Sequence, residues 1–257
     1  MSAADSVVIG HGILHSLPAE LEAKGLDGAV FMITDTTVGR RFSADVEGIL
    51  QRSGRKFSTK QVPPGGQAKS LHQAAELYDW LIGSGAERGD TILALGGGVI
   101  GDLAGYVAAT FLRGVKWAQV ATTLLAQVDS SIGGKVGVDL PGGKNLVGSF
   151  HTASLSLLDT AMLVDLPSNQ LISGWAEVAK TAMIFDRDLF DTIEEGADEP
   201  RDPDLLVHAV RRCVAHKARV VDEDPLDQGP RAILNYGHTI GHAIEASTGY
   251  DRFLHGE

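Results

Sequence analysis

The stretch TILALGGGVIGD at residues 91–102 decides the fold of this chain. Residues 91–95 form an apolar run of strand length, glycines follow at once, and a helix-like segment then covers 99–112. Strand, glycine-rich turn and helix in this order fit the pattern G-x-G-x-x-G, which is typical of nucleotide-binding α/β folds. The glycines let a backbone approach a pyrophosphate, and the helix start offers N–H groups. A tight turn without a ligand is the alternative interpretation.

The same alternation of strand and helix extends in both directions from this turn. Strand-like runs lie at 7–9, 29–34, 116–120 and 155–158, and amphipathic helices are predicted at 38–52 and 70–82. This order predicts a Rossmann-like α/β domain over 1–165, with a mostly parallel sheet. Only helices are predicted afterwards, at 169–185, 203–221 and 238–246. We therefore expect an all-α second domain over 166–257, which the chain leaves incomplete.

Composition narrows the class of protein further. The 257 residues are 44% hydrophobic and 21% charged, which is globular composition. A net charge of −11 argues against a nucleic-acid binder, and no apolar run is long enough to cross a bilayer. The single cysteine, Cys213, excludes a disulfide framework. No signal peptide is evident, so we expect a cytoplasmic protein without a membrane or nucleic-acid partner.

Several polar residues stand where chemistry is expected. Asp35 ends a strand and could bond a ribose hydroxyl, although a helix N-cap is at least as common an interpretation. Lys135 follows two glycines and Lys144 follows two more, in segments that we expect to be turns. Glycines expose backbone amides and lysines supply positive charge, so these segments favour an anionic small molecule. Solvated loop lysines are the simpler alternative for either one alone.

The helical part carries a set of candidate metal ligands. Glu177 and Lys180 lie three residues apart and share a helix face, as do His238 and His242, which lie four apart. Together with His255, Glu177 and His238 would supply three ligands and leave positions open for a substrate, as catalytic zinc sites do. An ordinary surface ion pair is the alternative for Glu177 and Lys180. The motif HTIGH lacks the glutamate of a zinc-protease helix.

Taken together, these motifs resemble one family, the 3-dehydroquinate synthases, within the sugar phosphate cyclases. The matching stretches are GGGVIGDLAGYVAATFLRG at 96–114, TTLLAQVDSSIGGK at 122–135, GKNLVGSF at 143–150, AEVAK at 176–180, NYGHTIGHAIE at 235–245 and HGE at 255–257. They occur in the family's order and cover most of the chain from about residue 90 onward, and the earlier part matches more loosely.

The resemblance implies an NAD-binding domain, a metal-binding helical domain and an active site in the cleft between them. It implies zinc or cobalt on Glu177, His238 and His255, a homodimer, and phosphate elimination and cyclisation of 3-deoxy-D-arabino-heptulosonate 7-phosphate. The implied catalytic residues are Lys135, Lys180, Arg231, Asn235 and His242. The implied substrate-binding residues are Arg113, Asp129, Lys135, Lys144, Asn145, Lys217 and Arg231. The implied cofactor-binding residues are Asp35, Lys69, Gly96, Gly97, Gly98, Asp102, Thr122, Thr123, Asp129, Lys135 and Lys144.

The resemblance leaves alternatives and shows departures. Arg113 resembles the family arginine that reaches the substrate phosphate, in its own or in a neighbouring subunit. Gly66 stands where the family usually has a glutamate that helps to hold the nucleotide. Further departures are Ala121, Val136, His151, Thr152 and Asp227. The alternatives are an aminodehydroquinate or 2-deoxy-scyllo-inosose synthase, an iron-dependent alcohol or glycerol dehydrogenase, and a fragment without catalytic activity.

Overall fold

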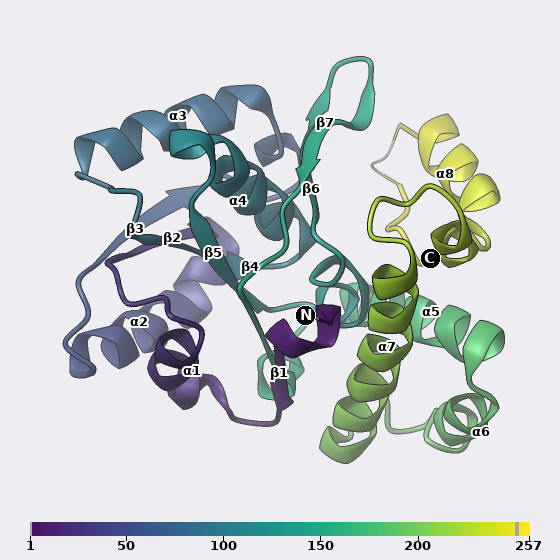
Figure 1. The fold of residues 1–257 in the computed structure, drawn as a ribbon. Helices are drawn as coiled ribbons and strands as arrows, with labels where there is room; N and C mark the ends of the chain where they lie inside the picture. Colours follow the sequence, from purple (N-terminus) through teal and green to yellow (C-terminus); the bar gives the residue numbers. More distant parts are fainter. Residues whose placement is uncertain (1, 250–251) are drawn as a thin grey trace.

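A parallel six-stranded sheet forms the frame of the first part of the chain (Figure 1). The computed structural model describes residues 2–249 and 252–257. The strand order is β1-β8-β5-β4-β2-β3, and neighbouring strands run parallel. The strands are β1 (Val7–Gly10), β2 (Val30–Asp35), β3 (Phe57–Val62), β4 (Thr91–Gly96), β5 (Lys116–Ala121) and β8 (Leu155–Asp159). The predicted Rossmann-like, mostly parallel sheet is confirmed, and β3 is a strand that the sequence interpretation did not include.

Helices cover both faces of this sheet. Alternate residues of the central strands point to opposite sides, and both sides are apolar. Phe31, Ile92 and Trp117 belong to a buried cluster with residues of α3 (Leu71–Gly83) and α4 (Gly98–Thr110). Met32 and Leu93, their neighbours along the strands, belong to a second cluster with residues of α1 (Leu17–Ala23) and α2 (Thr36–Arg52). The sheet is therefore buried on both faces, as the strongly apolar strands predicted.

A separate antiparallel hairpin contains the two lysines that were predicted to lie in turns. Lys135 begins β6 (Lys135–Leu140) and Lys144 lies in β7 (Gly143–Phe150), so neither lysine occupies the glycine-rich turn that was predicted. Gly137 and Gly148 face one another across the two strands, and a Cβ atom on Gly148 would lie 2.3 Å from the Val136 carbonyl oxygen. These glycines serve close strand pairing, which the sequence pattern did not distinguish from a turn. The hairpin projects from the sheet beside the last helix (Figure 1).

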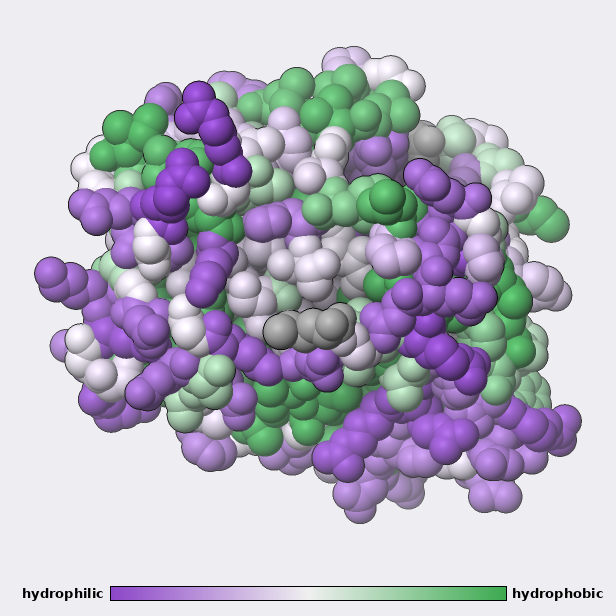
Figure 2. All heavy atoms as spheres, viewed as in Figure 1, coloured by the Kyte–Doolittle hydropathy of each residue, from purple (hydrophilic) through white to green (hydrophobic). Residues whose placement is uncertain are grey.

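The second part of the chain is helical, as predicted. It contains α5 (Ser168–Phe185), α6 (Arg187–Glu195), α7 (Pro203–Glu223) and α8 (His238–Ser247), and α6 was not foreseen. A buried cluster joins residues of β8, such as Leu158, to residues of α5 and α7, such as Val178 and Val210. The two parts therefore share apolar contacts, and the boundary between 165 and 166 stays a prediction. Hydrophilic residues gather over the region of α6 on the face drawn in Figure 2.

Among residues 2–249 and 252–257, no helix combines the length and apolarity that a membrane crossing requires. The α7 helix is the longest in the chain, and it carries Asp, Arg, His and Lys side chains along its length. Cys213 lies in this helix, and its thiol is buried. Burial raises the pKa of that thiol to about 12, which agrees with the interpretation of Cys213 as an apolar core residue.

Candidate active site

The glycine-rich turn lies between β4 and α4, at the carboxyl edge of the parallel sheet. A Cβ atom on Gly97 would lie 2.9 Å from Cγ2 of Thr123, and one on Gly98 would lie 3.0 Å from Oγ of Ser130. The hydroxyl of Thr122 is buried and has no hydrogen-bond partner in the described part of the chain. A buried hydroxyl without a partner costs free energy unless a ligand binds it. The turn and this hydroxyl therefore fit a polar ligand such as the predicted nucleotide.

Gly96 and Asp35 occupy neighbouring strand ends beside this turn. The Gly96 carbonyl accepts a hydrogen bond of 3.0 Å from the Thr122 N–H. Oδ1 of Asp35 accepts hydrogen bonds from the N–H groups of Thr37 and Val38, at 2.7 and 2.9 Å. Asp35 is thus the N-cap of α2, which was the simpler of its two interpretations. Its role toward a ribose stays a prediction.

Lys69 links α4 to the hairpin. Its ammonium lies 2.5 Å from Oδ2 of Asp102 and 4.0 Å from Oδ1 of Asp139, and it donates to the side-chain oxygen of Asn145. Lys69 is buried, so these contacts are shielded from water. Burial raises the pKa of Asp102, although Lys69 opposes the shift. The structure therefore brings together three predicted residues, Lys69, Asp102 and Asn145. Asn145 lies near the tip of the hairpin.

Asp129 and Lys217 meet across the two parts of the chain. The Lys217 ammonium lies 2.6 Å from Oδ1 of Asp129 and donates to the backbone oxygen of the same residue at 2.6 Å. Burial alone would raise the pKa of Asp129, but the positive charges of Lys217 and Lys180 outweigh it and lower that pKa to about 2. The Asp129 carboxyl is therefore ionised at neutral pH. One cation and one anion of the predicted substrate site are thus held together.

Three histidines gather where α8 faces the end of the described chain. The ligand nitrogens of His238, His242 and His255 all lie within 4.8 Å of one another. Nε2 of His255 lies 3.6 Å from Oε1 of Glu177. Imidazole nitrogens and a carboxylate are the ligands that zinc and cobalt sites use. The donor set fits a metal ion, and the exposed His242, predicted to be catalytic, joins the predicted ligands in one cluster.

The charges in this cluster shift its pKa values in opposite directions. The Glu177 carboxylate, with Glu245, favours the charged ring of His255 more than burial disfavours it, so the pKa of His255 is raised. Burial, helped by the positive charge of Lys180, lowers the pKa of His238. Burial would raise the pKa of Glu177, but contact with His255 and the charge of Lys180 lower it. At neutral pH the Glu177 carboxyl is therefore anionic and His238 is neutral.

Lys180 is buried rather than solvated. It forms an ion pair with Glu177 and donates a hydrogen bond of 2.7 Å to the Leu234 carbonyl oxygen. Both side chains of the pair are less than a tenth exposed. The alternative of an ordinary surface ion pair is wrong here, because burial removes the screening that weakens such pairs. Leu234 belongs to η7 (Pro230–Asn235), so Lys180 also fixes the segment that leads to α8.

The remaining predicted site residues are Arg231, Lys135 and Asn235. Arg231 is buried, and its guanidinium donates to the carbonyl oxygens of Pro225 and Gly133 at 3.0 and 3.1 Å. Lys135 forms an ion pair with Asp227, one of the positions that depart from the family. Exposed Asn235 ends η7. The bond from Arg231 to Gly133 therefore joins η7 to the residues just before β6.

Arg113 is not brought to this site. It follows α4 and precedes β5, so it lies at the amino edge of the sheet, whereas Gly96 and Thr122 lie at the carboxyl edge. Leu112, Arg113 and Gly114 have φ of 50°, 66° and 113°, a run of left-handed conformations that turns the chain sharply. Within one chain, Arg113 therefore does not reach the histidine cluster, and a role in the site of a neighbouring subunit stays a prediction.

The sequence interpretation missed Glu245 and Asp139. Glu245 is buried, its Oε1 lies 3.0 Å from Nδ1 of His255, and its Oε2 lies 3.9 Å from the Lys144 ammonium. A signal was present, because His238, His242 and Glu245 follow the i, i+4, i+7 spacing of one helix face. Asp139 accepts a 2.7 Å hydrogen bond from the Asn145 N–H, and no spacing in the sequence indicated it.

Comparison with known proteins decides the family. Residues 59–173 match the 3-dehydroquinate synthase N-terminal family and residues 174–257 match the 3-dehydroquinate synthase C-terminal family. This chain belongs to the 3-dehydroquinate synthase family. The 3-dehydroquinate synthase of Geotalea uraniireducens is 46% identical over 230 residues, which are 89% of this chain and 64% of that protein. The one from Citrifermentans bemidjiense is 43% identical over 253 residues, or 98% of this chain and 70% of that protein.

Solved structures of related cyclases share the fold. A 2-deoxy-scyllo-inosose synthase complexed with carbaglucose-6-phosphate, NAD+ and Co2+ is 29% identical, with a TM-score of 0.90 over 97% of this chain and 69% of that one. A 2-epi-5-epi-valiolone synthase from Streptomyces hygroscopicus with NAD+ and Zn2+ bound is 27% identical, with a TM-score of 0.89 over 97% of this chain and 70% of that one. The family models and the dehydroquinate synthase relatives confirm the predicted family. Identities of 43–46% to dehydroquinate synthases favour that family over the other cyclases.

Proposed function

We propose that this chain carries the nucleotide site and the metal centre of a 3-dehydroquinate synthase that acts on 3-deoxy-D-arabino-heptulosonate 7-phosphate. The convergence of basic side chains from both parts of the chain beside the histidine cluster carries this proposal. Lys144 comes from the hairpin, Lys217 from α7, and Lys180 from α5. On a chain with a net charge of −11, such placement favours an anionic substrate.

The cofactors belong to this proposal. Related cyclases hold NAD+ with Co2+ or Zn2+, and the glycine turn and the Glu177, His238 and His255 donors fit the same pair here. When bound, NAD+ would accept and return a hydride, and a divalent metal would act as a Lewis acid on a substrate oxygen. Gly97, Gly98, Thr122 and Thr123 would border the dinucleotide, and Asp35, Lys69, Gly96 and Asp102 would support that border.

The chain's own residues would bind and orient the substrate. Lys144 and Asn145, on the hairpin, and Lys217, paired with Asp129, would hold its anionic groups from the two sides. Arg231 and Lys135 lie on adjoining segments and would add charge once their present contacts to Gly133 and Asp227 open. The exposed His242 belongs to the histidine cluster and would hold or move a proton there, and Asn235 ends η7 three residues before His238.

The division into two domains, the dimer and the cytoplasmic setting remain part of the proposal. A site assembled from the carboxyl edge of the sheet and from α5, α7 and α8 supports a cleft between an α/β domain and a helical one. Arg113 at the opposite edge supports a dimer in which that residue serves a neighbouring subunit. Analytical ultracentrifugation would test the dimer directly, and a purely monomeric protein with full activity would contradict it.

Phosphate release tests the proposed function. The protein is incubated with the heptulosonate phosphate, NAD+ and Zn2+ or Co2+, and inorganic phosphate is measured with time. We expect release that requires both cofactors, and no release from glucose 6-phosphate, the comparison substrate for an inosose synthase. Release from glucose 6-phosphate alone would favour the second cyclase type. No release from either substrate, with NAD+ and metal both bound, would favour a fragment with a binding role only.

A further inference from the structure

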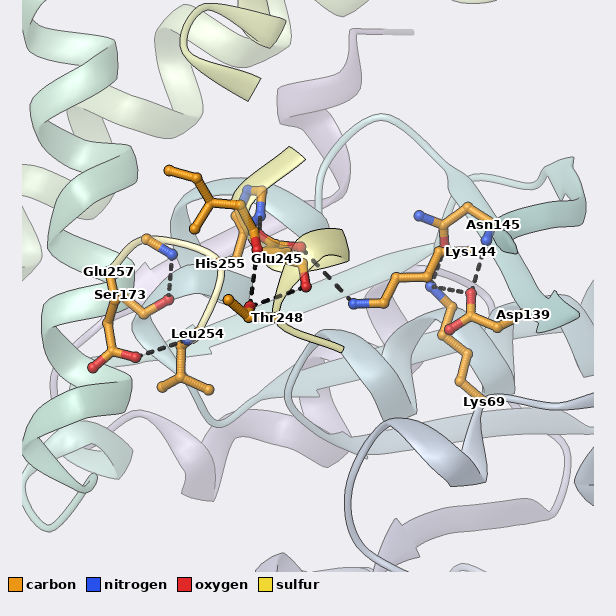
Figure 3. A network of polar contacts seen from close by, with 12 residues as sticks. Lys69, Asp139, Lys144, Asn145, Ser173, Glu245, Thr248, Leu254, His255 and Glu257 are labelled. Atoms are coloured by element: carbon orange, nitrogen blue, oxygen red, sulfur yellow. Dashed lines mark hydrogen bonds and ion pairs between the residues drawn. The ribbon is translucent and has the colours of Figure 1, made fainter. Parts of the chain in front are cut away.

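Glu245 lies between the histidine cluster and the hairpin. It lies in α8, and its side chain is 9% exposed. One carboxylate oxygen, Oε1, lies 3.0 Å from Nδ1 of His255, and the other, Oε2, lies 3.9 Å from the Lys144 ammonium. Figure 3 shows Glu245 between these two partners, with Lys144 reaching toward it from the hairpin. A buried carboxylate is costly unless it is hydrogen-bonded and charge-compensated, and here the two oxygens meet both needs.

The contact with His255 fixes which ring nitrogen carries a proton. A carboxylate next to Nδ1 accepts a hydrogen bond from that nitrogen, so in the neutral ring, the form that binds a metal, the lone pair lies on Nε2. Nε2 of His255 is the atom that faces Glu177, at 3.6 Å from Oε1 of that residue. The ring is thus held between two carboxylates, with its second nitrogen directed toward the candidate ligand set. This is the geometry in which an outer carboxylate orients a metal-binding histidine.

The Lys144 ammonium, 3.9 Å from the second oxygen of Glu245, compensates the charge of that oxygen from the side of the hairpin. Asn145, the next residue of the hairpin, is itself fixed, because its N–H donates to Asp139 at 2.7 Å and its side-chain oxygen accepts from Lys69. Lys69 in turn contacts Asp102 of α4, the helix that follows the glycine turn. Polar contacts therefore run from α4 to Asn145 and from Lys144 to Glu245 and His255, and the peptide bond between Lys144 and Asn145 joins the two sets.

We propose that Glu245 is a positioning residue that orients His255 for metal binding and that Lys144 of the hairpin holds it in that role. The proposal rests on the proposed function, because it takes His255 to be a metal ligand. Glu245 would thus belong to the metal centre without itself binding the metal. The proposal also gives the hairpin a second task besides contacting substrate, since the lysine that would bind an anion also fixes the carboxylate behind the metal ligand.

Titration with Co2+ tests this inference without measuring turnover. Visible absorbance of bound Co2+ reports both affinity and coordination geometry. We compare the parent protein with Glu245→Ala, Glu245→Gln and the control Glu194→Ala, an exposed residue of α6. Loss of an orienting partner of a metal-binding histidine weakens binding by about 10- to 100-fold, and we expect Glu245→Ala to fall in this range. The control should bind as the parent does.

The glutamine variant separates orientation from folding. Its side-chain oxygen can still accept from Nδ1 of His255, so we expect Co2+ affinity between those of the parent and the alanine variant. A melting curve of each protein without metal shows whether it is folded, and the glutamine variant carries the test if the alanine variant is not. Equal affinity of the parent and both Glu245 variants would overturn the inference and leave the ligand set standing. Absence of Co2+ binding by the parent would overturn the proposed metal centre as well.

Discussion

The Lys217 ammonium lies 2.6 Å from Oδ1 of Asp129, a residue 88 positions earlier in the chain. Asp129 is in η5 (Ala126–Ser130), between the strands of the α/β part, and Lys217 is in α7 of the helical part. This pair fixes the two parts of the proposed site relative to each other. It also keeps the Asp129 carboxyl ionised, because the positive charge of Lys217 offsets the cost of burying it.

Lys217→Met should destabilise the protein, because it leaves the Asp129 carboxylate without its partner. Loss of a charged hydrogen bond of this kind costs about 1.5–3 kcal/mol. The pKa of Asp129 should rise from about 2. Urea unfolding followed by circular dichroism measures the free energy, with the exposed Lys56→Met as the matched control. Equal stability of the two variants would show that the pair contributes nothing to folding.

Gly97→Val should weaken NAD+ binding by more than tenfold while Co2+ still binds. A Cβ atom added at this position would lie 2.9 Å from Cγ2 of Thr123, so a branched side chain must displace Thr123 or fill the space for the ligand. Calorimetry with NAD+ measures the effect. Gly83→Val is the control, because nothing lies within 4 Å of a Cβ there. Unchanged NAD+ affinity in the Gly97 variant would leave the turn with a purely structural role.

His238→Ala should remove a metal ligand. Loss of residues that merely support a ligand costs about 10- to 100-fold in affinity, so loss of a ligand should cost at least that much. Equilibrium dialysis followed by elemental analysis of zinc measures occupancy. His208→Ala on the exposed side of α7 serves as control. Stoichiometric zinc in the His238 variant would contradict the ligand set, and the same experiment on His242→Ala shows whether that neighbour also coordinates.

Lys144→Ala should lower substrate affinity or turnover by well over tenfold. A charged contact that becomes buried when the substrate binds is worth about 2–5 kcal/mol, whereas an exposed ion pair is worth at most about 1 kcal/mol. Steady-state phosphate release measures the loss. Lys56→Ala is the control. Similar kinetics for both variants would show that Lys144 is a solvated lysine and that the anion site lies elsewhere.

Asp186→Asn should destabilise the protein at neutral pH but much less in acid. Two hydrogen bonds of 2.6 Å from Arg212, with further contacts from His216 and the Leu189 N–H, hold the pKa of Asp186 well below its ordinary value. A lowered folded-state pKa stabilises the protein above the unfolded pKa of about 3.9. That stability is lost as the pH falls from there through the folded-state pKa. Urea unfolding at pH 7 and pH 3 should therefore give a smaller difference between variant and parent at pH 3, and an equal difference at both values would contradict this.

The α/β frame follows from the sequence alone, because apolar runs and glycine positions are local signals. The apolar run at 91–95 and the glycines after it reappear as β4, the turn and α4. The helices at 168–185, 203–223 and 238–247 follow the predicted segments closely, because hydrophobic spacing of 3.6 residues is a property of each segment alone. Residue type and family resemblance suffice to indicate Glu177, His238 and His255 as candidate ligands.

Which polar groups meet depends on how distant segments pack. Asp35 proved to be an N-cap, Lys135 and Lys144 proved to lie in strands, and Arg113 proved to lie at the opposite edge of the sheet. The contact of Glu245 with both His255 and Lys144 joins three elements that no spacing relates. Hydrogen bonds and ion pairs act over a few ångströms, so they depend on how distant segments pack, and that packing is set by the apolar residues around them.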